Sequence, residues 1–338
     1  MSFLPTGAGQ GFNNNSSTYT GEFAGKFINA AFQAAPTLAN ANVKIMDNIK
    51  FQSVIQDFSL AALGGNDGIV LDSSCDYADG LNLNVTEVVI TPAELQTTLT
   101  LCKETFHNDW QSKMQKMSAH DDVPMTFEQY MLMYIGGRIG SEIETLIWSG
   151  QGSTLGDGFA QRLADGLTGG LASQRIDLGD TRAEAGTVKG FFASALDALP
   201  DRVYSNGPSG LAFYVGTNVY KAYVASLGAT NNGIQDYQTT WWGGNFNGLT
   251  YDGIPVIYAP GLDGFTNGAT TSPDDAIVLT YRDNLIFGTG LMNDYNYADV
   301  IDLAKIDGSR NVRVVYRYTA GTQIGNIEDA VLATTTIA

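Results

Sequence analysis

The sequence predicts an α+β chain of more than one domain, and three observations support this prediction. The Asp67-Gly68 pair, which lies between two β-like runs, is the strongest β-hairpin signal in the chain. Apolar residues from Phe127 to Ile147 recur at helical spacing and predict one long helix. Strand-like and helix-like runs alternate between residues 187 and 299, as they do in α/β domains. The 338 residues, 44% of them hydrophobic, are enough to bury the cores of two domains.

The net charge and the small share of charged residues limit the classes of function that this chain can have. The chain has 18 basic and 35 acidic residues and a net charge of -17, which disfavours direct binding to nucleic-acid phosphates. Only 16% of the residues are charged, well below the usual quarter. A soluble monomer rarely economises on surface charge in this way. We therefore expect a protein that covers much of its surface with copies of itself.

The sequence shows no sign of export or of a membrane segment. Its first residues, MSFLPTGAGQGF, lack the basic and apolar regions of an export signal, and no apolar run reaches the roughly 20 residues of a membrane span. Cys75 and Cys102 are too few for a disulfide scaffold and form no zinc motif, so we expect an intracellular protein. These two cysteines bracket one β-like run. A disulfide between them and two buried reduced thiols are both open at this point.

Residues 1–46 are expected to form an arm. They hold only three charged residues and are rich in Gly, Asn, Ser and Ala, with single aromatic residues such as Phe23 and Phe27. Spaced aromatic residues in a weakly charged segment suit a chain that becomes ordered on a neighbouring subunit. A flexible terminus with incidental aromatic residues is the alternative.

The next segment predicts a long, protruding hairpin. The runs IKFQSVIQDFSL and IVLD flank a turn that contains Asn66, Asp67 and Gly68. A third β-like run, LNLNVTEVVI, precedes Pro92. After it, AELQTTLTLCKETFHNDW has helical spacing through Leu95 and its successors, so we expect the chain to change there from β to α structure.

The clearest helix follows Pro124. Thr126 and Gln129 form a capping box, and the apolar spacing continues for about 21 residues, or roughly 32 Å. Glycines in the interior of this helix favour close packing against another backbone; they are Gly136, Gly137 and Gly140. Residues 150–186 are rich in Gly and Asp and are expected to form loops and short strands.

The remaining elements follow in alternation. The run VKGFFASALDAL predicts a helix that Pro200 ends, and LAFYV predicts a strand. TNVYKAYVASL predicts another helix, and IPVIYAP and AIVLTY predict two further strands. Residues 300–318 alternate between apolar and other residues, which predicts one long strand exposed on one face.

The sequence does not match the active-site motifs that we compared with it, so we predict no catalytic, cofactor-binding or metal-binding residue. The run GEFAGKF is one residue short of a phosphate loop and has Phe27 where Ser or Thr binds magnesium. The only histidines, His107 and His120, lie in one polar segment, which gives a poor basis for a Ser-His-Asp site. Acidic pairs are abundant but are expected by chance in so acidic a chain. For Trp241-Trp242, in a polar loop, we favour a subunit contact, with ordinary packing and ligand binding as alternatives.

Several segments, in their order, resemble the major capsid proteins of tailed double-stranded DNA bacteriophages, which have the Hong Kong 97-type fold. They are TYTGEFAGKFINAAF, LAFYVGTNVYKAY, GIPVIYAPGL, NLIFGTGL with Asp294, and VRVVYRYTAGTQIG. The resemblance spans most of the chain. It implies an N-terminal arm (1–46), an extended β-hairpin loop (47–92), a peripheral domain with a long spine helix (93–186 and 300–325), and an α/β axial domain (187–299 and 326–338).

The resemblance implies a structural subunit that forms pentamers and hexamers of an icosahedral capsid. Its expected partners are itself, scaffold, portal and decoration proteins, and packaged DNA bound without sequence specificity; it would assemble in the host cytoplasm and reside in the virion. The predicted interface residues are Phe23, Phe27, Lys50, Phe51, Asn66, Asp67, Gly68, Trp241 and Trp242. An encapsulin-type compartment has the same fold and is one alternative, and a carbohydrate-acting hydrolase that uses paired carboxylates is another.

Overall fold

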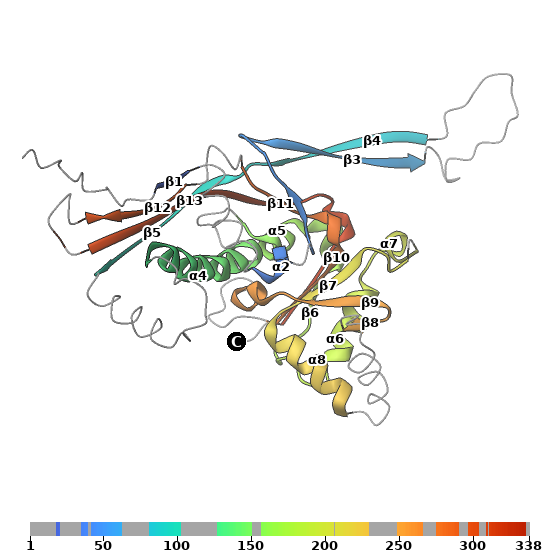
Figure 1. Ribbon diagram of the computed structural model, residues 1–338. Coiled ribbons are helices and arrows are strands. Elements are labelled where there is room, and N and C mark those ends of the chain that lie inside the picture. The colour runs from blue at the N-terminus through green and yellow to red at the C-terminus, as the bar shows by residue number, and fades with distance from the viewer. Residues whose placement is uncertain are drawn as a thin grey trace, which may run out of the picture.

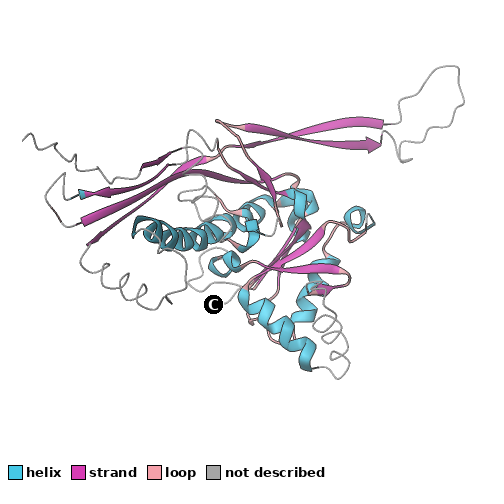
Figure 2. Ribbon diagram, viewed as in Figure 1, coloured by secondary structure: helices cyan, strands magenta, loops and turns pink. Residues whose placement is uncertain are grey.

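The computed structural model describes residues 18–20, 35–39, 42–62, 81–102, 127–150, 157–205, 207–229, 249–265, 275–290, 297–303, 309 and 311–335. Within these residues the chain forms two six-stranded sheets and a separate two-stranded ribbon, with helices packed on the sheets (Figures 1 and 2). The ribbon, labelled β3 and β4 in Figure 1, extends away from the rest of the molecule.

The first sheet is built around its longest strand, β13. Its strands are β1 (Thr18–Thr20), β2 (Lys44–Met46), β5 (Ala93–Cys102), β11 (Leu285–Gly288), β12 (Tyr297–Asp302) and β13 (Asn311–Ile324). Strand β5 pairs antiparallel with β13 along ten residues, from Asn311↔Cys102 to Ala320↔Ala93. The helix α4 (Phe127–Ser149) lies along one face of this sheet in Figure 1. Side chains of both elements share one core, which gives the sheet its buried face.

The second sheet is covered on both faces. Its strand order is β6 (Arg175–Asp177), β14 (Val331–Thr334), β10 (Ala276–Tyr281), β7 (Leu211–Val215), β9 (Ile254–Tyr258) and β8 (Thr250–Tyr251). All five residues of β7 are buried because they alternate between two cores. Phe213 packs with α6 (Val188–Asp197) and α8 (Thr217–Ala229), whereas Tyr214 packs in the core shared with α4.

A hydrogen-bonded cluster joins the short helix α2 (Pro36–Ala39) to α4. The backbone N–H of Thr37 donates to Glu144 Oε2 at 3.1 Å, and its hydroxyl donates to the other carboxylate oxygen. Trp148 Nε1 donates to Thr37 Oγ1 at 2.9 Å. Burial raises the pKa of Glu144, and the hydrogen bonds from Thr37 oppose this shift. The hydroxyl of Tyr214 donates to the carbonyl of Asn42 and fixes the same segment to the second sheet.

Most of the long elements are confirmed. The predicted long helix is α4, with 23 residues from Phe127 to Ser149. The helices predicted in VKGFFASALDAL and TNVYKAYVASL are α6 and α8, and the three strands predicted in this part of the chain are β7, β9 and β10.

The helix expected after Pro92 is wrong, because Ala93–Cys102 is the strand β5. The spacing between Leu95 and Leu99 puts two residues on one side of a helix, but residues four apart also share a face of a strand. The β-branched residues Thr97, Thr98 and Thr100 favour the extended chain, and ten pairs with β13 stabilise it.

The hairpin has a different second strand from the one predicted. Strand β3 (Ser53–Ala62) pairs with β4 (Leu81–Ile90), the third β-like run, and not with IVLD. The run IVLD and the Asp67-Gly68 turn lie outside the described residues. A strand of ten residues needs a partner of equal length, which the four-residue run IVLD does not offer.

Three further predictions are wrong. Residues 300–318 contain the end of β12 and the start of β13, two strands that pair antiparallel. Val314 and Val315, which lie on opposite faces of β13, are both buried, so neither face is exposed there. Residues 150–186 include the helix α5 (Phe159–Gly166), whose side chains at Phe159 and Leu163 enter the main core. Close packing is also wrong for Gly137, since no atom lies within 4 Å of the position a Cβ would take.

Candidate assembly interface

The β3–β4 ribbon belongs to neither of the two large sheets. Its strands pair along ten residues, from Ser53↔Ile90 to Ala62↔Leu81, and among the described strands they pair only with each other. A rise of about 3.4 Å per residue gives a ribbon on the order of 30 Å long. A lone two-stranded ribbon is marginally stable in water unless something packs on it.

One face of the ribbon is apolar and exposed. Its side chains keep from 42% to 54% of their surface exposed: Val54, Leu81, Leu83, Val85 and Val89. They share a face because side chains alternate along each strand and the register aligns Val89 with Val54. The opposite face is polar, and there Asn82 Nδ2 donates to Asn84 Oδ1 at 3.2 Å. The ribbon is therefore amphipathic, and no described residue covers its apolar face enough to bury it.

The root of the ribbon is held firmly. Ile49, Ile90 and Ile286 form a small core beneath it. Gly288 leaves room for this core, because a Cβ at that position would lie 2.7 Å from Ile90 Cδ1. Gln323 Nε2 on β13 also donates to the carbonyl of Val89 at 2.9 Å. The root is thus fixed to the first sheet, and the rest of the ribbon projects from it.

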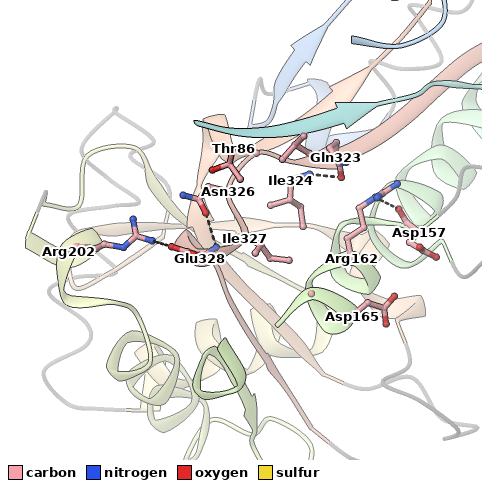
Figure 3. Close-up of a pocket in the computed structure, with 13 residues that line it drawn as sticks. Thr86, Asp157, Arg162, Asp165, Arg202, Gln323, Ile324, Asn326, Ile327 and Glu328 are labelled. Carbon is pink, nitrogen blue, oxygen red and sulfur yellow. Dashed lines mark hydrogen bonds and ion pairs between the residues drawn. The ribbon is translucent and has the colours of Figure 1, made fainter. Parts of the chain in front are cut away.

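A pocket of about 540 Å³ lies at this root (Figure 3). It is lined by Thr86, Val88, Asp157, Arg162, Asp165, Gly166, Arg202, Gln323, Ile324, Gly325, Asn326, Ile327 and Glu328. Arg162 Nε donates to the carbonyl of Asp157 at 3.0 Å. Arg202, on the short helix α7 (Asp201–Ser205), pairs with Glu328 at 3.1 Å and with Asp329 at 2.8 Å. Arg162 and Arg202 therefore stabilise the wall of the pocket, because each is bonded to a neighbouring segment.

We also searched the described residues for metal sites, membrane-spanning helices and titratable groups with shifted pKa values. They contain no group of three or more His, Cys, Asp or Glu side chains placed to hold a metal ion. No helix among them is both long and apolar enough to cross a membrane. Burial raises the pKa of Tyr214 and of Tyr316, so neither phenol is an acid–base group at neutral pH. Together with Glu144 they are groups of the core.

Two of the predicted interface residues can be placed. Lys50 and Phe51 precede β3 at the root of the ribbon, and both are exposed, Phe51 by 77%. The other seven lie outside the described residues: Phe23, Phe27, Asn66, Asp67, Gly68, Trp241 and Trp242.

The proposed disulfide stays a prediction. Cys102 ends β5 as an exposed free thiol, and Cys75 lies outside the described residues. The exposure of Cys102 differs from the buried thiol that was the alternative.

None of the interface residues predicted from the sequence belongs to the apolar face of the ribbon. The run LNLNVTEVVI places apolar residues at Leu81, Leu83 and Val85 with polar residues between them, and this alternation is the signal of a half-exposed strand. The run was recognised as β structure. The predicted hairpin pairs IKFQSVIQDFSL with IVLD, which leaves the run LNLNVTEVVI without a partner strand and its apolar face without a predicted role.

Comparison with known proteins gives similarity of structure and not of sequence. No family model matches the chain, and no curated protein matches it. The chain is similar to the capsid of a native GTA particle, with 9% identity and a TM-score of 0.53, over 90% of this chain and 91% of that one. It is similar to a structure of the satellite phage P4 procapsid including size determination (Sid) protein, with 12% identity and a TM-score of 0.51, over 92% and 98%. A structure from Mycobacterium phage Ogopogo has 14% identity and a TM-score of 0.53, over 87% and 91%. At such identities the likeness shows the fold, and the predicted α+β Hong Kong 97-type fold is confirmed.

Proposed function

We propose that this chain is the major capsid protein of a tailed double-stranded DNA bacteriophage, a structural subunit without catalytic activity. Two of the structures that share its fold are described as a capsid and a procapsid. The observation on the chain itself that carries the proposal is the apolar face of the β3–β4 ribbon, which projects from the molecule and is left half exposed. Exposed apolar patches of this kind mark contacts with another protein.

The geometry suits a ribbon that lies over a neighbouring copy. Its root is fixed by the small isoleucine core and by Gln323, so the ribbon enters the contact with its face already oriented. Burying a Val or Leu side chain completely is worth about 1.5–3 kcal/mol, so a half-exposed one has about 1 kcal/mol left to gain. Five such side chains in one contact, repeated around a ring of subunits, favour a closed assembly over the monomer.

The finer features of the proposal come from the family it resembles. Pentamers and hexamers would form the icosahedral shell, with scaffold, portal and decoration proteins as partners, in the host cytoplasm and then in the virion. The net charge of -17 suits DNA that is driven into the shell by a motor and held without sequence-specific contacts. Phe23, Phe27 and the other predicted contact residues, and the domain boundaries given above, belong to this proposal.

Electron microscopy and sedimentation of the purified chain test the proposal. We expect rings, shells or tubes that sediment far faster than a 36.1 kDa monomer. A species that stays monomeric at every concentration, with or without scaffold protein, would contradict it. Particles from the parent source that are filled with DNA would separate a phage capsid from an encapsulin-type compartment. A saturable sugar site on a small species would favour a hydrolase. No observation on the described residues favours either alternative.

A further inference from the structure

Glu87 is a charged residue within the apolar face of the ribbon. It lies between Val85 and Val89 on β4, and its cross-strand partner on β3 is Gln56. Gln56 Nε2 donates to Glu87 Oε1 at 2.9 Å. No described residue hydrogen-bonds to the second carboxylate oxygen, Oε2, and the side chain is exposed. The pair therefore interrupts the apolar row at one position, where a carboxylate is oriented by a neutral amide.

Glu87 destabilises the contact only when another subunit covers the apolar face and removes water from its carboxylate. In the free subunit, water solvates Oε2. If a second copy covers Val85 and Val89, Glu87 lies between them and loses that water. A carboxylate buried with one neutral hydrogen bond is strongly disfavoured, whereas one that also meets a cation is tolerated. Charge complementarity therefore decides what the covering surface carries opposite Glu87.

We infer that Glu87 receives a Lys or Arg side chain from a second copy of this chain, and that this ion pair sets the register of the ribbon on its neighbour. The inference rests on the proposed function, because it requires that another copy covers the apolar face. An apolar stripe alone would allow the ribbon to slide by a pair of residues, since each step places one Val or Leu where another was. A single charge pair within the stripe removes the alternative positions.

The substitution Glu87→Leu distinguishes an intersubunit ion pair from the alternative that Glu87 stays solvated. If Glu87 is a solvated residue at the rim, replacing it with Leu extends the apolar stripe and lowers the concentration at which the chain assembles. If it pairs with a cation, the same change leaves that cation buried without a partner. We then expect the concentration for half-assembly to rise at least about tenfold, as happens when one partner of a buried charge pair is removed. Glu87→Gln should raise it less, because an amide oxygen still accepts a hydrogen bond.

The assay is sedimentation of the purified full-length chain over a range of concentrations. Glu94→Leu is the matched control, since Glu94 is an exposed Glu on β5 and not on the ribbon, and this variant should assemble like the original chain. Circular dichroism and the Tm of each unassembled variant establish that it folds. Assembly of Glu87→Leu at the original concentration or below would overturn the inference.

Leu83→Asp in the same assay tests the proposed function separately. If Leu83→Asp blocks assembly while Glu87→Leu does not weaken it, the ribbon contact stands and the ion pair fails. If Leu83→Asp assembles like the original chain, the ribbon contact itself fails, and the ion pair fails with it.

Discussion

Placing a charge on the apolar face of the ribbon should stop assembly without unfolding the subunit. Leu83 is the most exposed of the five apolar side chains of this face, with 54% of its surface accessible, and belongs to none of the hydrophobic cores of the described residues. Leu83→Asp therefore removes little from the stability of the folded subunit, and we expect its Tm to change by no more than a few degrees.

The cost falls on the contact between subunits. Leu83 forfeits about half of the 1.5–3 kcal/mol that complete burial supplies, or about 1 kcal/mol. The new carboxylate would also lose water in an apolar contact, which costs several kcal/mol more. A total of about 3 kcal/mol or more corresponds to a weakening of each contact by a factor on the order of 100.

Sedimentation velocity at increasing concentration measures this effect. Asn84→Asp is the matched control, because it adds the same charge one residue away on the polar face. We expect Leu83→Asp to remain as free subunits at concentrations where the original chain and Asn84→Asp assemble. Assembly of Leu83→Asp at the original concentration, or equal failure of the two variants, would refute the reasoning about the faces.

Three further predictions concern the core and the cysteines. The free energy of unfolding of the original chain, relative to that of Glu144→Gln, should fall as the pH rises above about 4.5. The reason is that a raised pKa means that the folded state binds the proton of Glu144 more tightly than the unfolded state does. Urea unfolding of both chains at several pH values measures this difference, and a difference that grows with pH would contradict the prediction. Gly261→Ala should destabilise the fold by about 1–3 kcal/mol, since its Cβ would lie 2.1 Å from the carbonyl oxygen of Glu144. Gly190→Ala lies within α6, where no atom is within 4 Å of the new Cβ, and should stabilise the fold by up to about 1 kcal/mol. Thermal unfolding compares the two variants, and equal changes in stability would contradict the packing at Gly261. Cys102 should react with a thiol reagent in the folded, unassembled chain, and titration of the denatured, non-reduced chain should give two thiols; no reaction at either stage would indicate the disulfide with Cys75.

The sequence predicts elements well where one periodicity excludes the other. In α4 the apolar positions continue for six turns at helical spacing, which no strand satisfies. In β7 five consecutive apolar or aromatic residues, and in β10 four, suit strands buried on both faces, as the two cores around Phe213 and Tyr214 require.

The failures occur where local patterns are ambiguous. Leu95 and Leu99 share a face in a helix and in a strand, so only the pairing of β5 with β13 decides between them. Asp67-Gly68 is a strong local signal and predicts the wrong hairpin partner, because the ten pairs of β3 with β4 join residues that are distant in the sequence. Such pairings depend on tertiary structure, which propensity does not report.

The candidate interface was predicted less completely than the fold. Composition predicts that the chain covers its surface with copies of itself, and Phe51 stays a predicted contact residue. The apolar face itself needs the register of β3 on β4, since only the pairing shows that Val54 lies on the side of Leu83 and that Glu87 interrupts the same row. The functional reading of an alternating run thus depends on knowing its partner strand.

A three-dimensional reconstruction of the assembled particle tests the central claim most directly. We expect Leu81, Leu83 and Val85 to lie within about 4.5 Å of a neighbouring copy, with Asn82 and Asn84 on the side away from it. A ribbon that stays in solvent, or one that rests on its neighbour through the asparagine face, would contradict the claim that this apolar face builds the shell.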